Sequence, residues 1–177
     1  MTKAVVPEDI LAYPATLRRD RDGRYLVRFR DLPEALTDGA TKRDALGEAS
    51  DALSEAIAAR IVTGEEIPLP SLPRGQDYRV APDATITLKA GLYKALKELN
   101  LSIADLARRL KVDHREARRL LDPRHPTKLP RLREALAAVD IGIGIVLLSQ
   151  RPGRGGVWLP EVQLRQKKPA LAEPGRA

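Results

Sequence analysis

Residues 102–121 constrain the fold of this chain most, because they have the pattern of two short amphipathic helices joined by a tight turn. Apolar side chains recur at helical spacing in both parts of the segment: Ile103, Leu106, Ala107 and Leu110, then Ala117, Leu120 and Leu121. Ser102 and Asp113 each precede one helix and have an acidic residue three positions later, the spacing of a capping box. The segment therefore predicts a helix-turn-helix, the commonest way a small protein reads duplex DNA.

The turn between these helices contains Lys111 at a position where glycine is more usual. If the position requires a positive φ, a residue with a Cβ costs about 1 kcal/mol there. We expect the packing of the helix pair to absorb that cost.

The outward side of the second predicted helix is basic, since its cationic side chains emerge opposite the buried Ala117 and Leu120. An arginine can contact guanine O6 and N7 with two hydrogen bonds, a helix N-terminus favours phosphate, and basic loop residues can touch the DNA backbone. The predicted DNA-binding residues are Ser102, His114, Arg115, Arg118, Arg119, Arg124 and Lys128. The alternative is a solvated basic face on an ordinary helix pair.

The net charge of +7 is unevenly distributed along the 177 residues. Residues 1–81 carry 12 lysines and arginines against 14 acidic residues, whereas residues 82–150 carry 13 against 8. The positive charge therefore lies with the predicted helix-turn-helix, as phosphate binding requires. Residues 1–81 have a net negative charge, so this half is expected to bind a different partner.

Cysteine is absent, which excludes a disulfide framework and a thiolate zinc site. Together with the lack of a signal peptide, this favours a cytoplasmic protein. The longest apolar run, residues 141–148, is far shorter than the roughly 20 residues that a membrane-spanning helix needs.

The N-terminal half begins with a predicted β-hairpin. Residues 13–18 and 24–30 have strand-like composition, and the turn between them contains the Asp22-Gly23 step. A brief third strand is expected near residues 35–37. The hairpin offers one apolar face that another element must cover.

A long helix is predicted to supply that cover. Thr41 is its expected N-cap and Gly64 its expected end. Its apolar stripe consists of Ala45, Leu46, Ala49, Ala52, Leu53, Ala56, Ile57 and Ile61. The proline-rich residues 67–73 are expected to be extended, and residues 78–80 could add a fourth strand.

The C-terminal part adds a predicted helix over residues 130–139, buried through Leu132, Leu136 and Val139. Residues 141–148 are prone to form a strand, with two open alternatives. Pairing with a second copy would give a two-fold dimer with recognition helices roughly 34 Å apart, matched to a palindromic operator. The other alternative is an edge strand within one subunit.

The predicted fold class is α+β, with a small antiparallel sheet and one long helix followed by an all-α DNA-binding domain. Four regions are expected: a partner-binding domain (1–66), a proline-rich linker (67–83), the helix-turn-helix domain (84–150) and a basic tail (151–177). The tail is expected to be disordered, although Val157 to Leu159 could dock.

The order of several short motifs resembles the HicB antitoxin family. In the N-terminal half these are Tyr13-Pro-Ala, the hairpin, Asp31-Leu-Pro, Thr37-Asp-Gly39, Thr41, an alanine-rich helix and a proline-rich exit. In the C-terminal half they are Leu92-Tyr93, Leu106 to Leu110, Arg119 to Pro123 and Leu129 to Leu136. The resemblance covers about residues 11–148 and departs at Arg30, where a proline more usually precedes Asp-Leu-Pro.

The resemblance implies a type II toxin-antitoxin module. The N-terminal domain would be similar to a partial ribonuclease H fold and would occlude a small basic mRNA-cleaving HicA-type toxin, while the C-terminal domain would repress the operon. The residues that the resemblance places near the toxin are Tyr13, Asp31, Leu32, Pro33 and Asp38. The alternative is that these residues only shape turns.

Catalysis is not predicted. The candidate metal-binding acids of the N-terminal half are Asp20, Asp22, Asp31, Asp38, Asp44, Glu48 and Asp51. Turns, loops and the polar face of one helix explain these acids better than a two-metal site does. We therefore expect a binding protein with no enzymatic activity, metal or cofactor. The alternative to an antitoxin is a stand-alone repressor with a ligand-binding or dimerising N-terminal domain.

Overall fold

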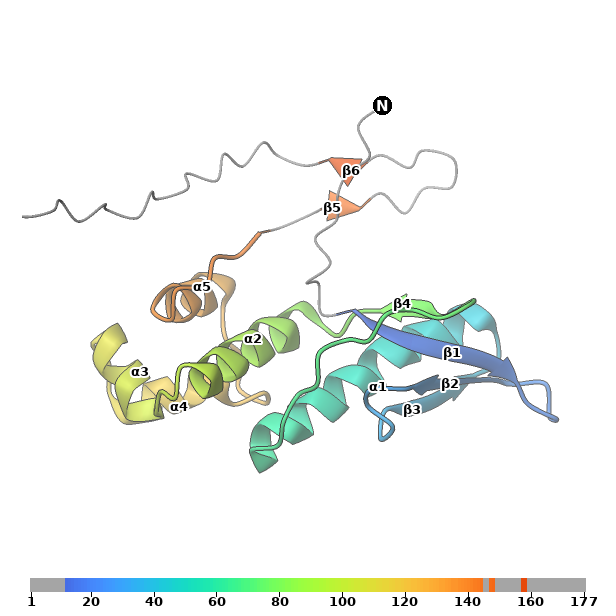
Figure 1. Ribbon diagram of the computed structural model, residues 1–177, viewed down its shortest axis with the longest axis horizontal. Coiled ribbons are helices and arrows are strands. Elements are labelled where there is room, and N and C mark those ends of the chain that lie inside the picture. The colour runs from blue at the N-terminus through green and yellow to red at the C-terminus, as the bar shows by residue number, and fades with distance from the viewer. Residues whose placement is uncertain (1–11, 145–146, 149–156, 159–177) are drawn as a thin grey trace, which may run out of the picture. The chain divides into compact units, whose positions relative to one another are not determined.

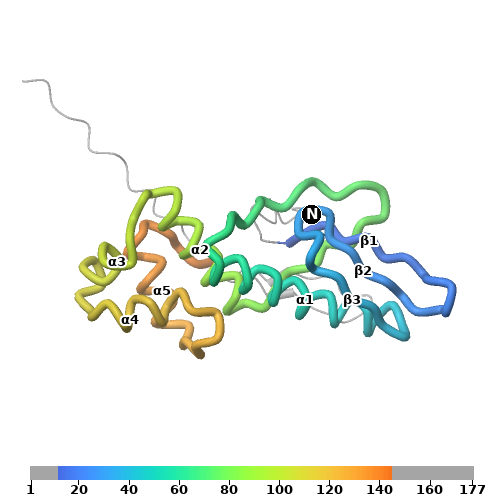
Figure 2. The backbone as a smooth tube through the Cα atoms, turned by 90° about the horizontal axis from the view of Figure 1, so that it is seen from below, coloured from blue at the N-terminus to red at the C-terminus, as the bar shows by residue number. Residues whose placement is uncertain are grey.

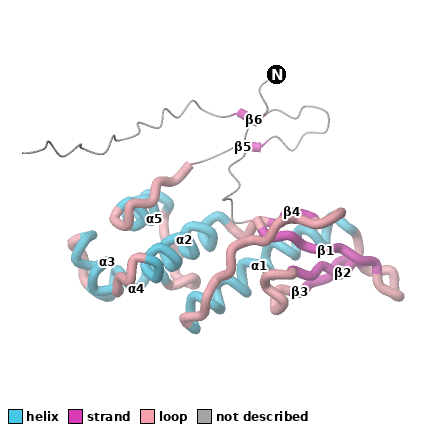
Figure 3. The backbone as a smooth tube through the Cα atoms, in the orientation of Figure 1, coloured by secondary structure: helices cyan, strands magenta, loops and turns pink. Residues whose placement is uncertain are grey.

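The computed structural model describes residues 12–144, 147–148 and 157–158. A four-stranded antiparallel sheet and one long helix come first, and a group of shorter helices follows (Figures 1 and 3). The α+β class predicted from the sequence is confirmed.

The sheet consists of β1 (Tyr13–Arg19), β2 (Tyr25–Phe29), β3 (Leu36–Gly39) and β4 (Tyr78–Val80), in the order β3-β2-β1-β4. The hairpin has Leu17 opposite Val27, and Gly23 takes a φ of +86° in its turn. The third strand begins one residue later than expected, because Ala35 N donates to Leu32 O (2.9 Å) in a turn.

One long helix, α1 (Lys42–Thr63), packs on the sheet through contacts with β2 and β3. The side chain of Thr41 accepts a hydrogen bond from Asp44 N, and Gly64 ends the helix with a φ of +77°. Six of the predicted stripe residues are buried: Ala45, Ala49, Leu53, Ala56, Ile57 and Ile61. The predicted caps and buried face of this helix are confirmed.

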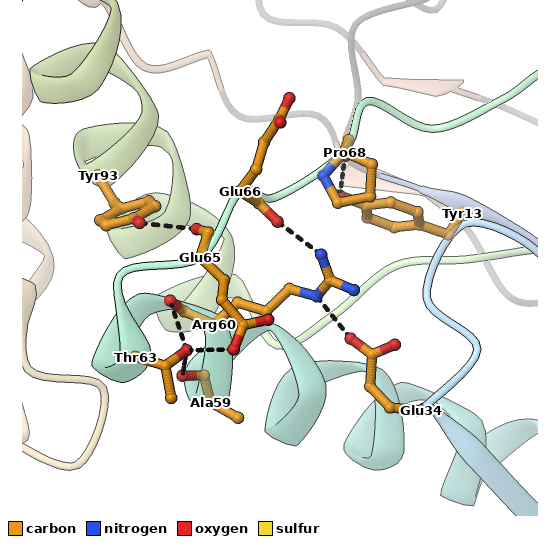
Figure 4. A network of polar contacts seen from close by, with 9 residues as sticks. All are labelled: Tyr13, Glu34, Ala59, Arg60, Thr63, Glu65, Glu66, Pro68 and Tyr93. Atoms are coloured by element: carbon orange, nitrogen blue, oxygen red, sulfur yellow. Dashed lines mark hydrogen bonds and ion pairs between the residues drawn. The ribbon is translucent and has the colours of Figure 1, made fainter.

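Residues 65–77 contain no helix or strand, yet several side chains hold them in place (Figure 4). Tyr13 Oη donates to Pro68 O at 2.8 Å. Arg60 of α1 donates to Glu66 O at 2.6 Å and to the Glu34 carboxylate at 2.5 Å. The proline-rich segment therefore follows a defined path beside the sheet and α1.

The helical part consists of α2 (Ala84–Glu98), α3 (Ile103–Leu110), α4 (His114–Leu121) and α5 (Leu129–Ala137). Its apolar core is formed by Leu92, Ala95, Leu96, Leu106, Ala107, Ala117, Leu120, Ala135, Leu136 and Val139. The helix predicted over residues 130–139 corresponds to α5 and lies close to its expected limits, and its predicted residues Leu132, Leu136 and Val139 are buried. Helix α2 was not predicted from the sequence.

Helix α2 connects the two halves, which lie in one compact unit up to residue 143. It contacts α1 (Figure 2), and its side chains bind the chain just beyond the end of α1. Tyr93 Oη donates to Glu65 O at 2.7 Å, Lys94 Nζ to Ile67 O at 2.9 Å, and Lys97 Nζ to Gly64 O at 2.6 Å. Three side chains of one helix thus attach the helical part to the sheet part.

Beyond residue 143, β5 (Leu147–Leu148) pairs antiparallel with β6 (Val157–Trp158) of the same chain. Residues 141–144 form no strand, and glycine at 142 and 144 weakens strand formation there. The expected pairing with a second copy stays a prediction. Apart from residues 157–158, the predicted disordered tail lies outside the described residues. Among the helices of the described part, none has the length and apolarity to cross a membrane.

Candidate nucleic-acid interface

Both helices of the predicted pair begin at capping residues. Ser102 Oγ accepts from Asp105 N at 3.1 Å, and the Asp105 carboxylate accepts from Ser102 N at 2.9 Å, which completes a capping box. The Ser102 hydroxyl also donates to the Asp105 carboxylate at 2.6 Å, and this bond first and the one from Ser102 N second lower the pKa of Asp105. Asp113 accepts from Glu116 N at 2.7 Å and so caps the second helix.

Lys111, in the turn between α3 and α4, has a positive φ. Its φ of 55° lies in the left-handed region. Lys111 N donates to Arg108 O at 3.3 Å and Val112 N donates to Ala107 O at 3.0 Å, so the last carbonyls of α3 are satisfied. The lysine therefore occupies a backbone conformation that glycine would adopt at lower cost.

The seven predicted DNA-binding side chains all lie at the surface: Ser102, His114, Arg115, Arg118, Arg119, Arg124 and Lys128. None of the five lysines and arginines among them forms an ion pair with another described residue, whereas the nearby Arg108 and Arg131 do. An anionic ligand could therefore bind these cations without first displacing a carboxylate.

Five of these seven residues line one groove of about 710 Å³ beside α4: Ser102, Arg115, Arg118, Arg119 and Arg124. The apolar part of the groove comes from Ile61, Val62, Tyr93, Leu96, Leu101, Ile103, Leu121 and Pro123. His114 and Lys128 are exposed but do not line it. The structure thus gathers most of the predicted set on one side of the helix pair.

Polar contacts hold α4 against its neighbours. Arg131 of α5 forms ion pairs with Glu116 of α4 and with Glu134 of its own helix. Arg109 of α3 donates to Ala138 O at 2.9 Å, just after α5. One ion pair thus joins α4 to α5, and one hydrogen bond joins α3 to the end of α5, so α5 connects to both helices of the pair.

One residue near this face was missed by the sequence analysis. Lys89 of α2 is fully buried, and its Nζ donates to the carbonyl oxygens of Asp122 and His125 in the loop after α4. A signal for it does exist, because Lys89, Leu92, Tyr93 and Leu96 have the spacing of one helix face. A lysine within an apolar stripe marks a buried polar contact.

The five residues expected to face a protein partner are not equally accessible. Tyr13 and Leu32 have no exposed surface, and burial, followed by the Asp31 carboxylate, raises the pKa of Tyr13 to about 12. Asp31 is half-buried and accepts from Ser71 N at 2.9 Å. Pro33 is exposed and Asp38 pairs with Arg24 at the surface. Tyr13 and Leu32 therefore support this region from within and do not offer it a contact side chain.

The net charge of the N-terminal half is small, but its acidic and basic side chains lie on different faces. The exposed side of α1 carries Lys42 and Arg43 at its start and, along the rest of its length, Asp44, Glu48, Asp51 and Glu55. On the sheet, Arg28 alternates with the buried Val27 and Phe29 along β2, and Arg28 and Arg18 of β1 border a second groove of about 490 Å³. The acidic surface is thus on the helix and a basic surface is on the strands.

Arg30, the position at which the sequence departs from the resemblance, ties the end of β2 to the segment before β4. Its guanidinium donates to Asp77 at 2.7 Å and to Ser71 Oγ at 3.0 Å. The pKa of Asp77 is lowered by the Arg74 backbone amide first and by Arg30 second. Arg30 therefore fixes the shape of this strand end.

The acids of the N-terminal half are dispersed over turns, loops and α1. Within residues 12–144, 147–148 and 157–158, no three histidine or acidic side chains lie close enough together to hold a metal ion. The candidate interface is therefore the group of exposed cations on α4 and the adjoining loop, and the acidic side chains of the N-terminal half are not part of it.

Comparison with known proteins gives a consistent result. Residues 12–91 match the family described as the HicB-like antitoxin of bacterial toxin-antitoxin systems. The chain is 38% identical to Antitoxin HicB 1 of Photorhabdus laumondii over 129 residues, covering 73% of this chain and 82% of the relative. It is 33% identical to Antitoxin HicB of Escherichia coli K12 over 138 residues, covering 78% of this chain and all of the relative.

Proposed function

The chain belongs to the HicB antitoxin family, and on that premise we propose that it neutralises a small mRNA-cleaving HicA-type toxin and represses its own operon by binding operator DNA. The observation that carries the DNA part is the exposed set of cations on α4 and the following loop, none of them paired with a described acid. The proposed neutralisation of a toxin rests on membership of this family.

In the DNA part of this proposal, α4 enters the major groove as the recognition helix of a helix-turn-helix. Arg115 and Arg118 read base edges, because guanidinium groups match guanine O6 and N7. Ser102 at the start of α3 and the loop residues Arg124 and Lys128 bind the phosphate backbone and set the register. A homodimer would present two such helices to a palindromic site.

In the toxin part of this proposal, the partner covers the N-terminal half near Pro33 and Asp38, which reach the surface. Tyr13 and Leu32 hold that surface in shape from the core, and Asp31 anchors it through Ser71. Residues 1–81 carry a net negative charge, which attracts a basic partner. Such attraction raises the rate at which the two proteins associate more than it raises the affinity of the complex. The chain acts by binding and has no catalytic activity of its own.

The experiment that tests this proposal is purification of the tagged chain from its native host at moderate salt, with mass spectrometry of what stays bound in stoichiometric amount. We expect one small basic protein whose free form stops growth. Recovery of the chain alone, still binding its own promoter, would instead identify a stand-alone repressor with a ligand-binding or dimerising N-terminal domain.

A further inference from the structure

Lys89 is a charged residue in the interior of the helical part. Its side chain has no exposed surface, and with Ser54 it is one of two polar side chains in the buried set of the described residues. Burial lowers the pKa of Lys89, and the Asp122 carboxylate opposes this effect. Lys89 forms no ion pair within the described part of the chain. A buried ammonium without a paired carboxylate is costly, so its hydrogen bonds need an explanation.

Those hydrogen bonds all go to the backbone just after the recognition helix. Nζ donates to His125 O at 2.6 Å and to the carbonyl oxygen of Asp122, the residue that caps the C-terminal end of α4. The ammonium therefore lies where unpaired helix carbonyls and the negative end of the helix dipole gather. A cation is favoured at that end of a helix.

Lys89 provides the long-range hydrogen bonds of the loop over residues 122–128. Its other hydrogen bonds are local, such as Arg124 N to the Asp122 carboxylate at 3.0 Å and His125 N to Asp122 O at 3.1 Å. Within residues 12–144, Lys89 supplies the only hydrogen bonds that reach the loop from outside residues 118–132. Without it, Arg124 and Lys128 would stand on a less constrained backbone.

We propose that Lys89 is a positioning residue for DNA binding, which fixes the last turn of α4 and the loop 122–128 so that Arg124 and Lys128 meet the phosphate backbone. This inference rests on the proposed operator binding. Lys89 itself does not touch the DNA, because its side chain is fully buried. It acts by holding two carbonyls on either side of Pro123 and Arg124.

The test compares K89M with K94M, which removes the same charge from the same helix. Lys94 Nζ donates to Ile67 O and forms no hydrogen bond with the loop among the described residues. The probe is a duplex carrying the promoter of the chain's own operon, titrated at several salt concentrations. We expect K89M to lower the affinity about tenfold and to reduce the salt slope by about one to two, as lost phosphate contacts do. K94M should leave the slope unchanged, and K89R, which keeps the charge, should restore most of the affinity.

A double-mutant cycle separates positioning from a general structural effect. In the presence of R124A and K128A, K89M should cause little further loss, because the contacts that it positions are already gone. If the losses add in full, the proposal is overturned. Lys89→Gln replaces K89M in every comparison if the methionine variant does not fold.

Amide hydrogen exchange of the free protein tests the same idea without DNA. Exchange over residues 122–128 should become faster in K89M and not in K94M. Equal protection in K89M and the wild type would overturn the proposal. If the wild type binds no promoter DNA, the proposed operator binding fails, whereas the exchange result still decides whether Lys89 holds the loop.

Discussion

Tyr13 in the first strand donates a 2.8 Å hydrogen bond to the carbonyl oxygen of Pro68, 55 residues further along the chain (Figure 4). Pro68 belongs to a segment that has no helix or strand of its own. The bond joins the buried face of the sheet to the chain that leads from α1 toward α2. Tyr13, which is expected at or near a partner surface, is thus also an internal anchor.

Alkaline pH should destabilise the protein through Tyr13. Its pKa is about 12 in the folded protein, against an ordinary value of 10.0. Below pH 10 the phenol is neutral in both states, and between pH 10 and 12 the unfolded chain loses the proton first. The contribution of Tyr13 to stability is therefore fully present below pH 10 and is lost as the pH rises through 12, a loss on the order of 3 kcal/mol for this pKa difference.

Tyr13→Phe isolates this effect from the other groups that titrate at high pH. At neutral pH the variant should be less stable by about 1 kcal/mol, because the Pro68 carbonyl loses its donor. Urea unfolding at intervals from pH 9 to 12 should show that difference shrinking and then reversing. A difference that stays constant with pH would contradict the assignment.

Operator binding should depend on Arg115 and Arg118. Replacing both with alanine should lower affinity for the promoter duplex by about 100-fold or more, since each arginine that reads a base contributes about 1–3 kcal/mol. Arg18→Ala with Arg28→Ala removes the same charge from the sheet and should change the affinity far less. Equal losses in the two double variants, measured by fluorescence anisotropy, would show that α4 is not the recognition helix.

Gly39 should tolerate no side chain, because β3 ends against the start of α1. A Cβ there would lie 2.7 Å from Ala45 Cα, a backbone atom that cannot turn aside. Gly39→Ala should therefore cost about 2–3 kcal/mol in the free energy of unfolding. Gly47→Ala is the matched control, since a Cβ there meets nothing within 4 Å. It should stabilise α1 by about 0.5–1 kcal/mol.

Lys111→Gly should stabilise the helix pair by about 1 kcal/mol, because φ at this position is 55°. Lys111→Ala loses the same charge but keeps the Cβ, so it should bring no comparable gain. Thermal unfolding of the two variants side by side measures the difference. A similar Tm for both would mean that the backbone conformation carries no cost here.

Several features could be predicted from the sequence because their causes act over a few residues. Helix caps bind amides two or three positions away, so Thr41, Ser102 and Asp113 predict where three helices begin. Apolar spacing predicts the buried faces of α1, α4 and α5 in the same way. The exposure of His114, Arg115, Arg118 and Arg119 follows from that spacing, because burial of one face of α4 leaves the other in solvent.

Other features depend on which distant segments meet, and no short-range pattern contains that information. The register of β1 decides that Tyr13 points into the core and reaches Pro68. The packing of α2 against the loop after α4 decides that Lys89 holds two carbonyls more than 30 residues away.

The sequence by itself therefore determined four of the five described helices, three of their N-caps and the basic face of α4, since local hydrogen bonds and apolar periodicity set these features, whereas α2 was not predicted. Only the tertiary structure decided which polar side chains are internal anchors and which remain free for a ligand. The physical reason is that a buried donor must find an acceptor, and the packing of distant segments selects which acceptor lies within reach.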